Sequence, residues 1–92
     1  IEFAADQVCV TSGAKNSLHN IFNCILEAGD EAIFFAPYLV SYPDMIALTG
    51  AKPVVVETKF DNNFEIDVTD LEKHITAKTK DVIINSPNNP TG

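Results

Sequence analysis

The chain has 92 residues, of which 46% are hydrophobic, and a formal net charge of -7. A chain this short buries a smaller share of its surface than a full domain, yet its hydrophobic content is well above that of a disordered protein. Thirteen acidic residues against six basic ones repel phosphate backbones, which argues against binding to DNA or RNA.

The sequence also argues against a membrane or metal protein. No apolar run approaches the roughly 20 residues that a membrane-spanning helix needs, and the first residues do not resemble a signal peptide, so we expect a cytoplasmic protein. Cys9 and Cys24 lack the spacing of zinc ligands and are expected to be buried free thiols, with no metal bound.

The first predicted elements are a strand and a helix. Residues 7–11 form a short, β-branched apolar run that ends at Ser12-Gly13, which is typical of a buried strand that meets a turn. The helix that follows is expected to end near Gly29. Its apolar stripe, spaced to lie on a sheet, consists of Leu18, Ile21, Phe22, Ile25 and Leu26.

A second strand and helix come next. Residues 31–35 are predicted to form a strand, and its run at residues 32–35 is apolar without alternation, as expected when both faces are covered. This strand ends before Pro37, and a helix over residues 41–49 follows and ends at Gly50.

The last third of the chain repeats the pattern. Residues 53–57 form a third strand, and the polar segment 59–65 is expected to be a surface excursion. Asp67 or Thr69 can cap the next helix, which leads to a fourth strand at residues 82–84.

This alternation predicts an α/β fold with a mostly parallel sheet in a single unit over residues 1–92. In such sheets, ligands bind beyond the carboxyl ends of the strands. Three segments with unusual residues occupy that position, namely residues 11–15, 36–42 and 85–92.

The first of these segments has small residues where a strand turns into a helix. The backbone N–H groups of Ala14 and Lys15 would be free at the positive end of the helix dipole, which suits an anion. The alternative is an ordinary turn capped by Ser12.

The last segment, residues 85–92, has three asparagines and two prolines directly after an apolar strand. Asn89 would present its amide to a bound group there, and the alternative is a plain turn, in which these residue types are common. In segment 36–42 an aromatic side chain could cover a flat cofactor ring or pack the loop onto the core.

These segments resemble the class I and II aminotransferases of the aspartate aminotransferase fold type, and most closely their bacterial aspartate aminotransferase branch. The resemblance covers essentially the whole chain and is strongest in VTSGAKNSL, GDEAIFFAPYLVSYPDM and KTKDVIINSPNNPTG. It implies a three-layer αβα domain that binds pyridoxal 5'-phosphate. Residues 1–92 would be an internal fragment of this large, cofactor-binding domain.

The resemblance implies roles for matching residues. Ala14 and Lys15 match backbone donors to the cofactor phosphate, and Gly13 allows the close turn. Asn89 matches the asparagine that hydrogen-bonds the ring hydroxyl oxygen and helps to hold the substrate carboxylate.

Leu39 departs from the family pattern, because relatives place at this position the aromatic residue that stacks on the cofactor ring. Leucine can cover the ring but loses a stacking energy of about 0.5–1.5 kcal/mol, unless Tyr38 takes its place. Pro90 and Pro37 match positions where the family often has cis prolines.

The residues that carry the family's chemistry follow the Asn-Pro-Thr-Gly motif, so this chain lacks the Schiff-base lysine, its acidic partner and the substrate-binding arginine. Lys15 is not expected to replace that lysine, because it opens the phosphate-site helix. His19 and His74 are expected to have surface or packing roles. We therefore expect no catalytic residue here and no activity from the 92 residues alone.

The resemblance implies a parent enzyme that transfers an amino group from an amino acid, with aspartate favoured, to a 2-oxo acid, and that forms a homodimer. Nucleic-acid and membrane partners are not expected. Two alternatives stay open: another pyridoxal-phosphate enzyme of this fold, such as a carbon–sulfur lyase, or the sensor domain of a transcription regulator.

Overall fold

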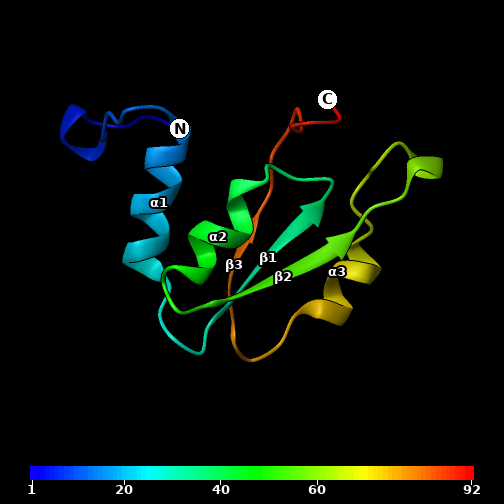
Figure 1. Cartoon of the computed structure of the whole chain (residues 1–92). Coiled ribbons are helices and arrows are strands. Elements are labelled where there is room, and N and C mark those ends of the chain that lie inside the picture. Colours follow the sequence, from blue (N-terminus) through cyan, green and yellow to red (C-terminus); the bar gives the residue numbers. More distant parts are fainter.

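A three-stranded parallel sheet forms the centre of the computed structural model, which describes all residues from 1 to 92. The strands are β1 (Glu31–Ala36), β2 (Lys52–Glu57) and β3 (Thr79–Ile83), arranged in the order β2-β1-β3. All three point toward the upper part of Figure 1. The predicted α/β fold with a parallel sheet is therefore confirmed.

Helices cover both faces of this sheet. They are α1 (Ala14–Ile25), α2 (Ser41–Ala47) and α3 (Val68–His74), with short 3-10 turns η1 (Ala5–Gln7) and η2 (Phe60–Asn62). Figure 1 shows α1 and α2 on one side of the sheet and α3 on the other. The excursion expected at residues 59–65 contains η2 and is largely exposed.

Burial of β1 on both faces explains its unbroken apolar sequence. Ala32 and Phe34 pack into a core formed with α1 and α2, while Ile33, which the pleat directs to the opposite face, is also fully buried. The other members of the α1–α2 core are Phe22, Leu26, Tyr42, Met45, Ile46 and Ala51.

The order of the strands determines where a ligand site is expected. The chain passes from β1 through α2 to β2, and then through α3 to β3 on the far side of β1. The connection from β1 to β2 and the connection from β2 to β3 run in opposite directions across the sheet. Because such crossovers are right-handed, α2 and α3 lie on opposite faces. The carboxyl ends of β1 and β3 thus flank a topological switch point, where open parallel sheets bind ligands.

The strand predicted over residues 7–11 is wrong. This segment contains the end of η1 and then extended backbone without strand pairing, and Val8 and Val10 are 60% and 92% exposed. An extended apolar segment becomes a strand only when a neighbouring strand accepts its hydrogen bonds, and none of the strands in these 92 residues does so. The strand predicted as the fourth, at residues 82–84, therefore corresponds to β3, the third strand observed.

The burial predicted for the cysteines is also wrong. Cys9 and Cys24 are free, as expected, but both are exposed. Cys9 lies in the unpaired N-terminal segment, and Cys24 lies on a side of α1 turned away from the core. Separately, none of the helices combines the length and the apolar character that crossing a membrane would require.

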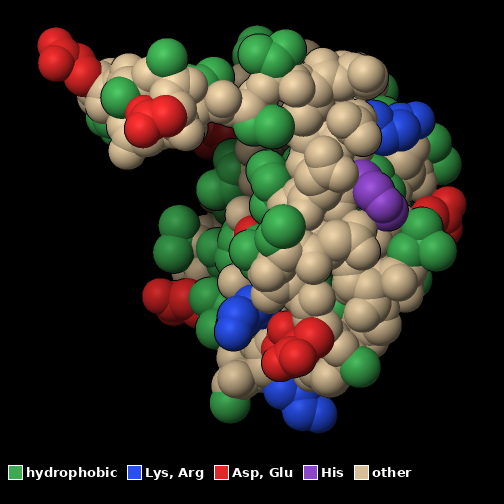
Figure 2. Space-filling model, turned by 90° about the vertical axis from the view of Figure 1, so that its left-hand side faces the viewer, with side chains coloured by type: hydrophobic (Ala, Val, Ile, Leu, Met, Phe, Trp, Pro, Cys, Tyr) green, Lys and Arg blue, Asp and Glu red, His purple; other side chains and the backbone are tan.

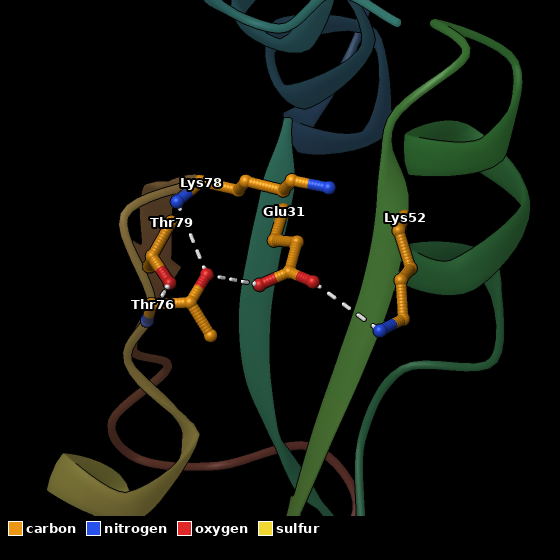
Figure 3. A network of polar contacts seen from close by, with 5 residues as sticks. All are labelled: Glu31, Lys52, Thr76, Lys78 and Thr79. Atoms are coloured by element: carbon orange, nitrogen blue, oxygen red, sulfur yellow. Dashed lines mark hydrogen bonds and ion pairs between the residues drawn. The ribbon is translucent and has the colours of Figure 1, made fainter. Parts of the chain in front are cut away.

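A polar network ties the three strands together at their amino ends (Figure 3). Glu31, only 8% exposed, accepts hydrogen bonds from the Thr76 hydroxyl at 2.7 Å and from the Lys52 ammonium at 3.2 Å. The Thr76 hydroxyl also accepts from the backbone N–H of Lys78 at 3.1 Å. The bond from Thr76, followed by that from Lys52, holds the pKa of the Glu31 carboxyl below its usual value.

Candidate functional site

The first part of the candidate site is the start of α1. Gly13 precedes this helix with a φ of 82°, and a Cβ built on it would have no atom within 4 Å. No carbonyl in the chain accepts from the N–H groups of Ala14 or Lys15, because α1 begins at Ala14. These two donors therefore lie unpaired at the positive end of a twelve-residue helix, on exposed residues.

Two hydroxyl groups make contacts within this turn. The Thr11 hydroxyl donates to the carbonyl of Gly13 at 3.2 Å and also contacts the hydroxyl of Ser17 in the first turn of α1. Ser12, the alternative cap, makes no side-chain hydrogen bond with the helix. The observed N-cap is Gly13, so the donors are not satisfied by a capping side chain.

The second part is the loop from β1 to α2. Leu39 is half-buried against the α1–α2 core. The ring of Tyr38 packs edge-to-face on Phe34 with 4.6 Å between centroids, and Tyr42 is buried on the same ring at 6.0 Å. The aromatic residues of this segment thus pack onto the core, and Leu39 occupies the position expected for the stacking residue.

Two neighbouring carbonyls fix the beginning of this loop. The carbonyl of Ala36 accepts from the hydroxyl of Thr58, just after β2, at 2.6 Å. The next carbonyl, that of Pro37, accepts from the side-chain amide of Asn88 at 2.9 Å. Thr58, which follows β2, and Asn88, which follows β3, therefore hold the last residue of β1 and the residue after it.

The third part is the turn that follows β3. Its backbone is closed by a hydrogen bond from the N–H of Gly92 to the carbonyl of Asn88 at 2.7 Å. Asn89 is exposed, and its amide has no hydrogen-bond partner in the chain. The peptide bonds before Pro37, Pro87 and Pro90 are cis.

All three parts lie at one end of the molecule. Figure 1 shows the first turn of α1 and the C-terminal turn at the upper end, toward which the strands point. The loops that carry Leu39 and Asn89 leave adjacent parallel strands, and the bond from Asn88 to Pro37 joins them directly. Lys15 lies in the first turn of α1 and Asn89 lies in the C-terminal turn, so both are at this end of the molecule.

The best-defined hollow at this edge is a cleft of about 360 Å³. It runs between the ends of β1 and β3 and the excursion after β2, and its lining includes Pro37, Tyr42, Thr58, Phe64, Asn85 and Asn88. Gly13, Ala14, Lys15, Leu39 and Asn89 do not line it. The predicted residues therefore share an edge of the sheet but do not enclose a single pocket within this chain.

Sequence reasoning missed Thr58 and Asn88. Thr58 is a polar residue directly after β2, and Asn88 is a polar residue in the turn that follows β3. Only their contacts across the sheet distinguish them from ordinary turn residues. The histidines make local contacts, as expected for packing roles: His19 with Asn23 within α1, and His74 with the carbonyl of Asp70 within α3.

Comparison with known proteins agrees with this geometry. The family model "Aminotransferase class I and II" matches residues 1–92. The chain is 49% identical over all of its length to a "Probable aspartate/prephenate aminotransferase" of Rickettsia conorii. It is 48% identical, again over all of its length, to an aspartate aminotransferase of Bacillus subtilis.

A solved structure supports the same relationship. The crystal structure of aspartate aminotransferase from Thermotoga maritima is 49% identical to this chain and matches 97% of it with a TM-score of 0.93. The chain spans 23% of the length of each of the two curated relatives and 24% of that crystallised chain.

Proposed function

The chain belongs to the class I and II aminotransferase family, and on that premise we propose that it forms part of the cofactor-binding large domain of a longer pyridoxal-phosphate-dependent enzyme. The proposed reaction moves an amino group from an amino acid, with aspartate favoured, to a 2-oxo acid. The names of the relatives support this choice, since they are aspartate or aspartate/prephenate aminotransferases.

The start of α1 fits the phosphate of the cofactor. The free N–H groups of Ala14 and Lys15 would donate to phosphate oxygens, and the helix dipole would favour the negative charge. Gly13 keeps the approach clear, because its missing side chain leaves open space beside the turn. Two unpaired backbone donors at the positive end of a twelve-residue helix are the observation that supports a bound anion.

The two loops at the switch point fit the rest of the cofactor. Leu39 would cover the ring, and the unpartnered amide of Asn89 would donate to the ring hydroxyl oxygen and to the substrate carboxylate. When bound, pyridoxal phosphate supplies an electron sink that stabilises negative charge on the substrate carbon that carries the amino group. The residues of this chain bind and orient, and none of them exchanges a proton with the substrate.

The test uses the longer protein that carries this chain. Aspartate and a 2-oxo acid should give the corresponding products, and Asn89→Ala should lower kcat/KM by about 10–100-fold, because hydrogen bonds to charged groups contribute about 1.5–3 kcal/mol. Asn62→Ala is the matched control, since that asparagine is exposed on η2 and makes only a 3.5 Å contact within its own loop.

Three outcomes would change the proposal. Release of ammonia and a thiol from a sulfur-containing amino acid, without transfer of the amino group to a 2-oxo acid, would indicate a carbon–sulfur lyase of the same fold. A protein that binds pyridoxal phosphate but transforms no amino acid would indicate a sensor domain. Equal activity of Asn89→Ala and the wild type would remove Asn89 from the site.

The proposal also covers the cellular location and the oligomeric state of the longer protein. A cytoplasmic homodimer is supported by two kinds of exposed side chain. Free thiols such as Cys9 and Cys24 persist in a reducing compartment. Figure 2 shows hydrophobic side chains exposed around a hollow on the face nearest α1, and exposed apolar surface of this kind fits contact with further protein.

A further inference from the structure

We propose that Asn88 is a positioning residue for the cofactor site, because its side-chain amide ties the turn that presents Asn89 to the loop that presents Leu39. The inference rests on the proposed function in one respect only, namely that these two loops hold a cofactor. The tie itself is a property of the chain and can be tested without any ligand.

The amide of Asn88 is fully used as a donor. It donates to the carbonyl of Pro37 at 2.9 Å and to the hydroxyl of Thr91 at 2.8 Å, which accounts for both hydrogens of the amide group. The first bond crosses between the loops, and the second holds the side chain against its own turn. Asn88 is half-buried, so water competes less for these bonds than it would at an exposed residue.

Tyr38 and Leu39 pack the loop after β1 onto the core, and the bond from Asn88 ties this loop to the turn after β3. No other hydrogen bond joins residues 37–40 to residues 85–92. Pro37 has no N–H to donate, so its carbonyl is the only backbone group through which this residue can be held. Thr58 holds the preceding carbonyl from the opposite side, and Asn88 completes the support.

Adjacent asparagines therefore have different tasks. Asn88 points its amide inward to the scaffold, whereas Asn89 is exposed with its amide free. A site works best when the residues that touch the ligand are locked by a second set of contacts. The hydrogen bonds of Asn88 restrain Asn89, which lies in the same turn, and Leu39, which lies in the loop after β1.

The first experiment measures hydrogen exchange in the cofactor-free longer protein. Asn88→Ala removes both donors. Asn88→Asp keeps the shape and can accept from the Thr91 hydroxyl, to which Asn88 donates, but it cannot donate to the carbonyl of Pro37. Both variants should speed amide exchange in residues 38–42, while Asn62→Ala should leave it unchanged. Unchanged exchange in both Asn88 variants would show that the bond does not restrain the loop.

The second experiment measures the dissociation constant of pyridoxal phosphate. Both Asn88 variants should bind it about fivefold to tenfold more weakly than the wild type, the effect of one lost hydrogen bond. If Asn88 acts through the loop, Asn88→Ala should cost little more in a protein that already carries Leu39→Ala, so the two effects should not add.

The outcomes separate this inference from the proposed function. A wild-type protein that fails to bind pyridoxal phosphate contradicts the proposed function. A wild type that binds it, with Asn88 variants that bind equally well, contradicts the positioning role alone. Additive effects of Asn88→Ala and Leu39→Ala would also overturn it, and if Asn88→Ala does not fold, Asn88→Asp decides the question.

Discussion

At the scale of single residues, the conformation of Gly13 determines whether the start of α1 can receive an anion. Its φ of 82° and ψ of 165° lie in a region that is essentially restricted to glycine. The constraint comes from the backbone itself, since an added Cβ would meet no neighbouring atom. Any other residue would rotate the turn and redirect the N–H of Ala14.

Gly13→Ala is therefore expected to cost about 1–3 kcal/mol of unfolding free energy and to weaken pyridoxal phosphate binding in the longer protein. Urea unfolding and cofactor titration measure the two effects. Gly29→Ala is the matched control, because Gly29 also has a positive φ and open space but lies before β1, at the amino ends of the strands. It should lower stability while leaving cofactor affinity unchanged, and equal loss of affinity in both variants would contradict a specific role for Gly13.

At the scale of elements, the Glu31 network sets how the sheet responds to acid. The carboxylate bridges β1 to Lys52 of β2 and to Thr76 in the segment that leads into β3. Its pKa is lowered in the folded chain, so the carboxylate form stabilises the fold above the usual value of 4.5. That contribution is lost as the pH falls below 4.5 and through the lower, folded-state pKa.

The urea midpoint of the longer protein should thus fall on acidification below 4.5 more steeply than that of Glu31→Gln, and the two should converge at low pH. Asp70→Asn is the comparison, because a bond from Lys73 also lowers the pKa of Asp70 but both groups are solvated on α3. Its effect should be much smaller. Parallel curves for wild type and Glu31→Gln would remove the carboxylate as the cause.

Elements were predictable where the sequence pattern alone determines burial. The apolar runs at residues 32–35 and 53–56 lie in strands, because helices of this chain pack on them and leave residues 32–34 buried and residues 53–55 half-buried. The similar run at residues 7–11 does not, because an apolar pattern indicates a need for burial without specifying the partner. The burial predicted for Cys9 and Cys24 was wrong for the same reason, because the sequence does not specify what would cover them.

The candidate site was predictable to the level of its segments. The ends of the strands located the loops with Leu39 and Asn89, because parallel topology gathers such loops at one edge. The start of α1 was located from Gly13 and the apolar stripe of the helix, since the strand predicted before it does not form. The tie from Asn88 to Pro37 joins residues 51 positions apart, and nothing in either turn identifies its partner. The packing of Tyr38 on Phe34 likewise depends on ring orientations that periodicity does not contain.

At the scale of the whole molecule, the chain has a small core and a large apolar surface. Eleven of its 92 residues are buried, while large apolar side chains such as Val10, Val40 and Leu48 are exposed. The three segments of the candidate site share an edge without enclosing a pocket. The 92 residues by themselves should therefore bind the cofactor weakly and have no activity.

Borohydride reduction tests this expectation on the 92-residue chain alone. After incubation with pyridoxal phosphate, mass spectrometry should find no lysine modified at stoichiometric yield, because the proposed role of Lys15 is to bind the cofactor phosphate through its backbone N–H. The longer protein, treated in the same way, should be modified at a single lysine outside these residues. Stoichiometric modification of Lys15 in the short chain would contradict the assignment.

The position of the Glu31 network has a consequence for evolution and engineering. Ionic and hydroxyl contacts lock the strand starts, whereas the opposite edge consists of loops. The contacts that stabilise the strand starts are thus separate from the loops of the candidate site. A mutagenesis library limited to the exposed residues Val40, Asn85 and Ser86 should explore new specificities with little risk of misfolding.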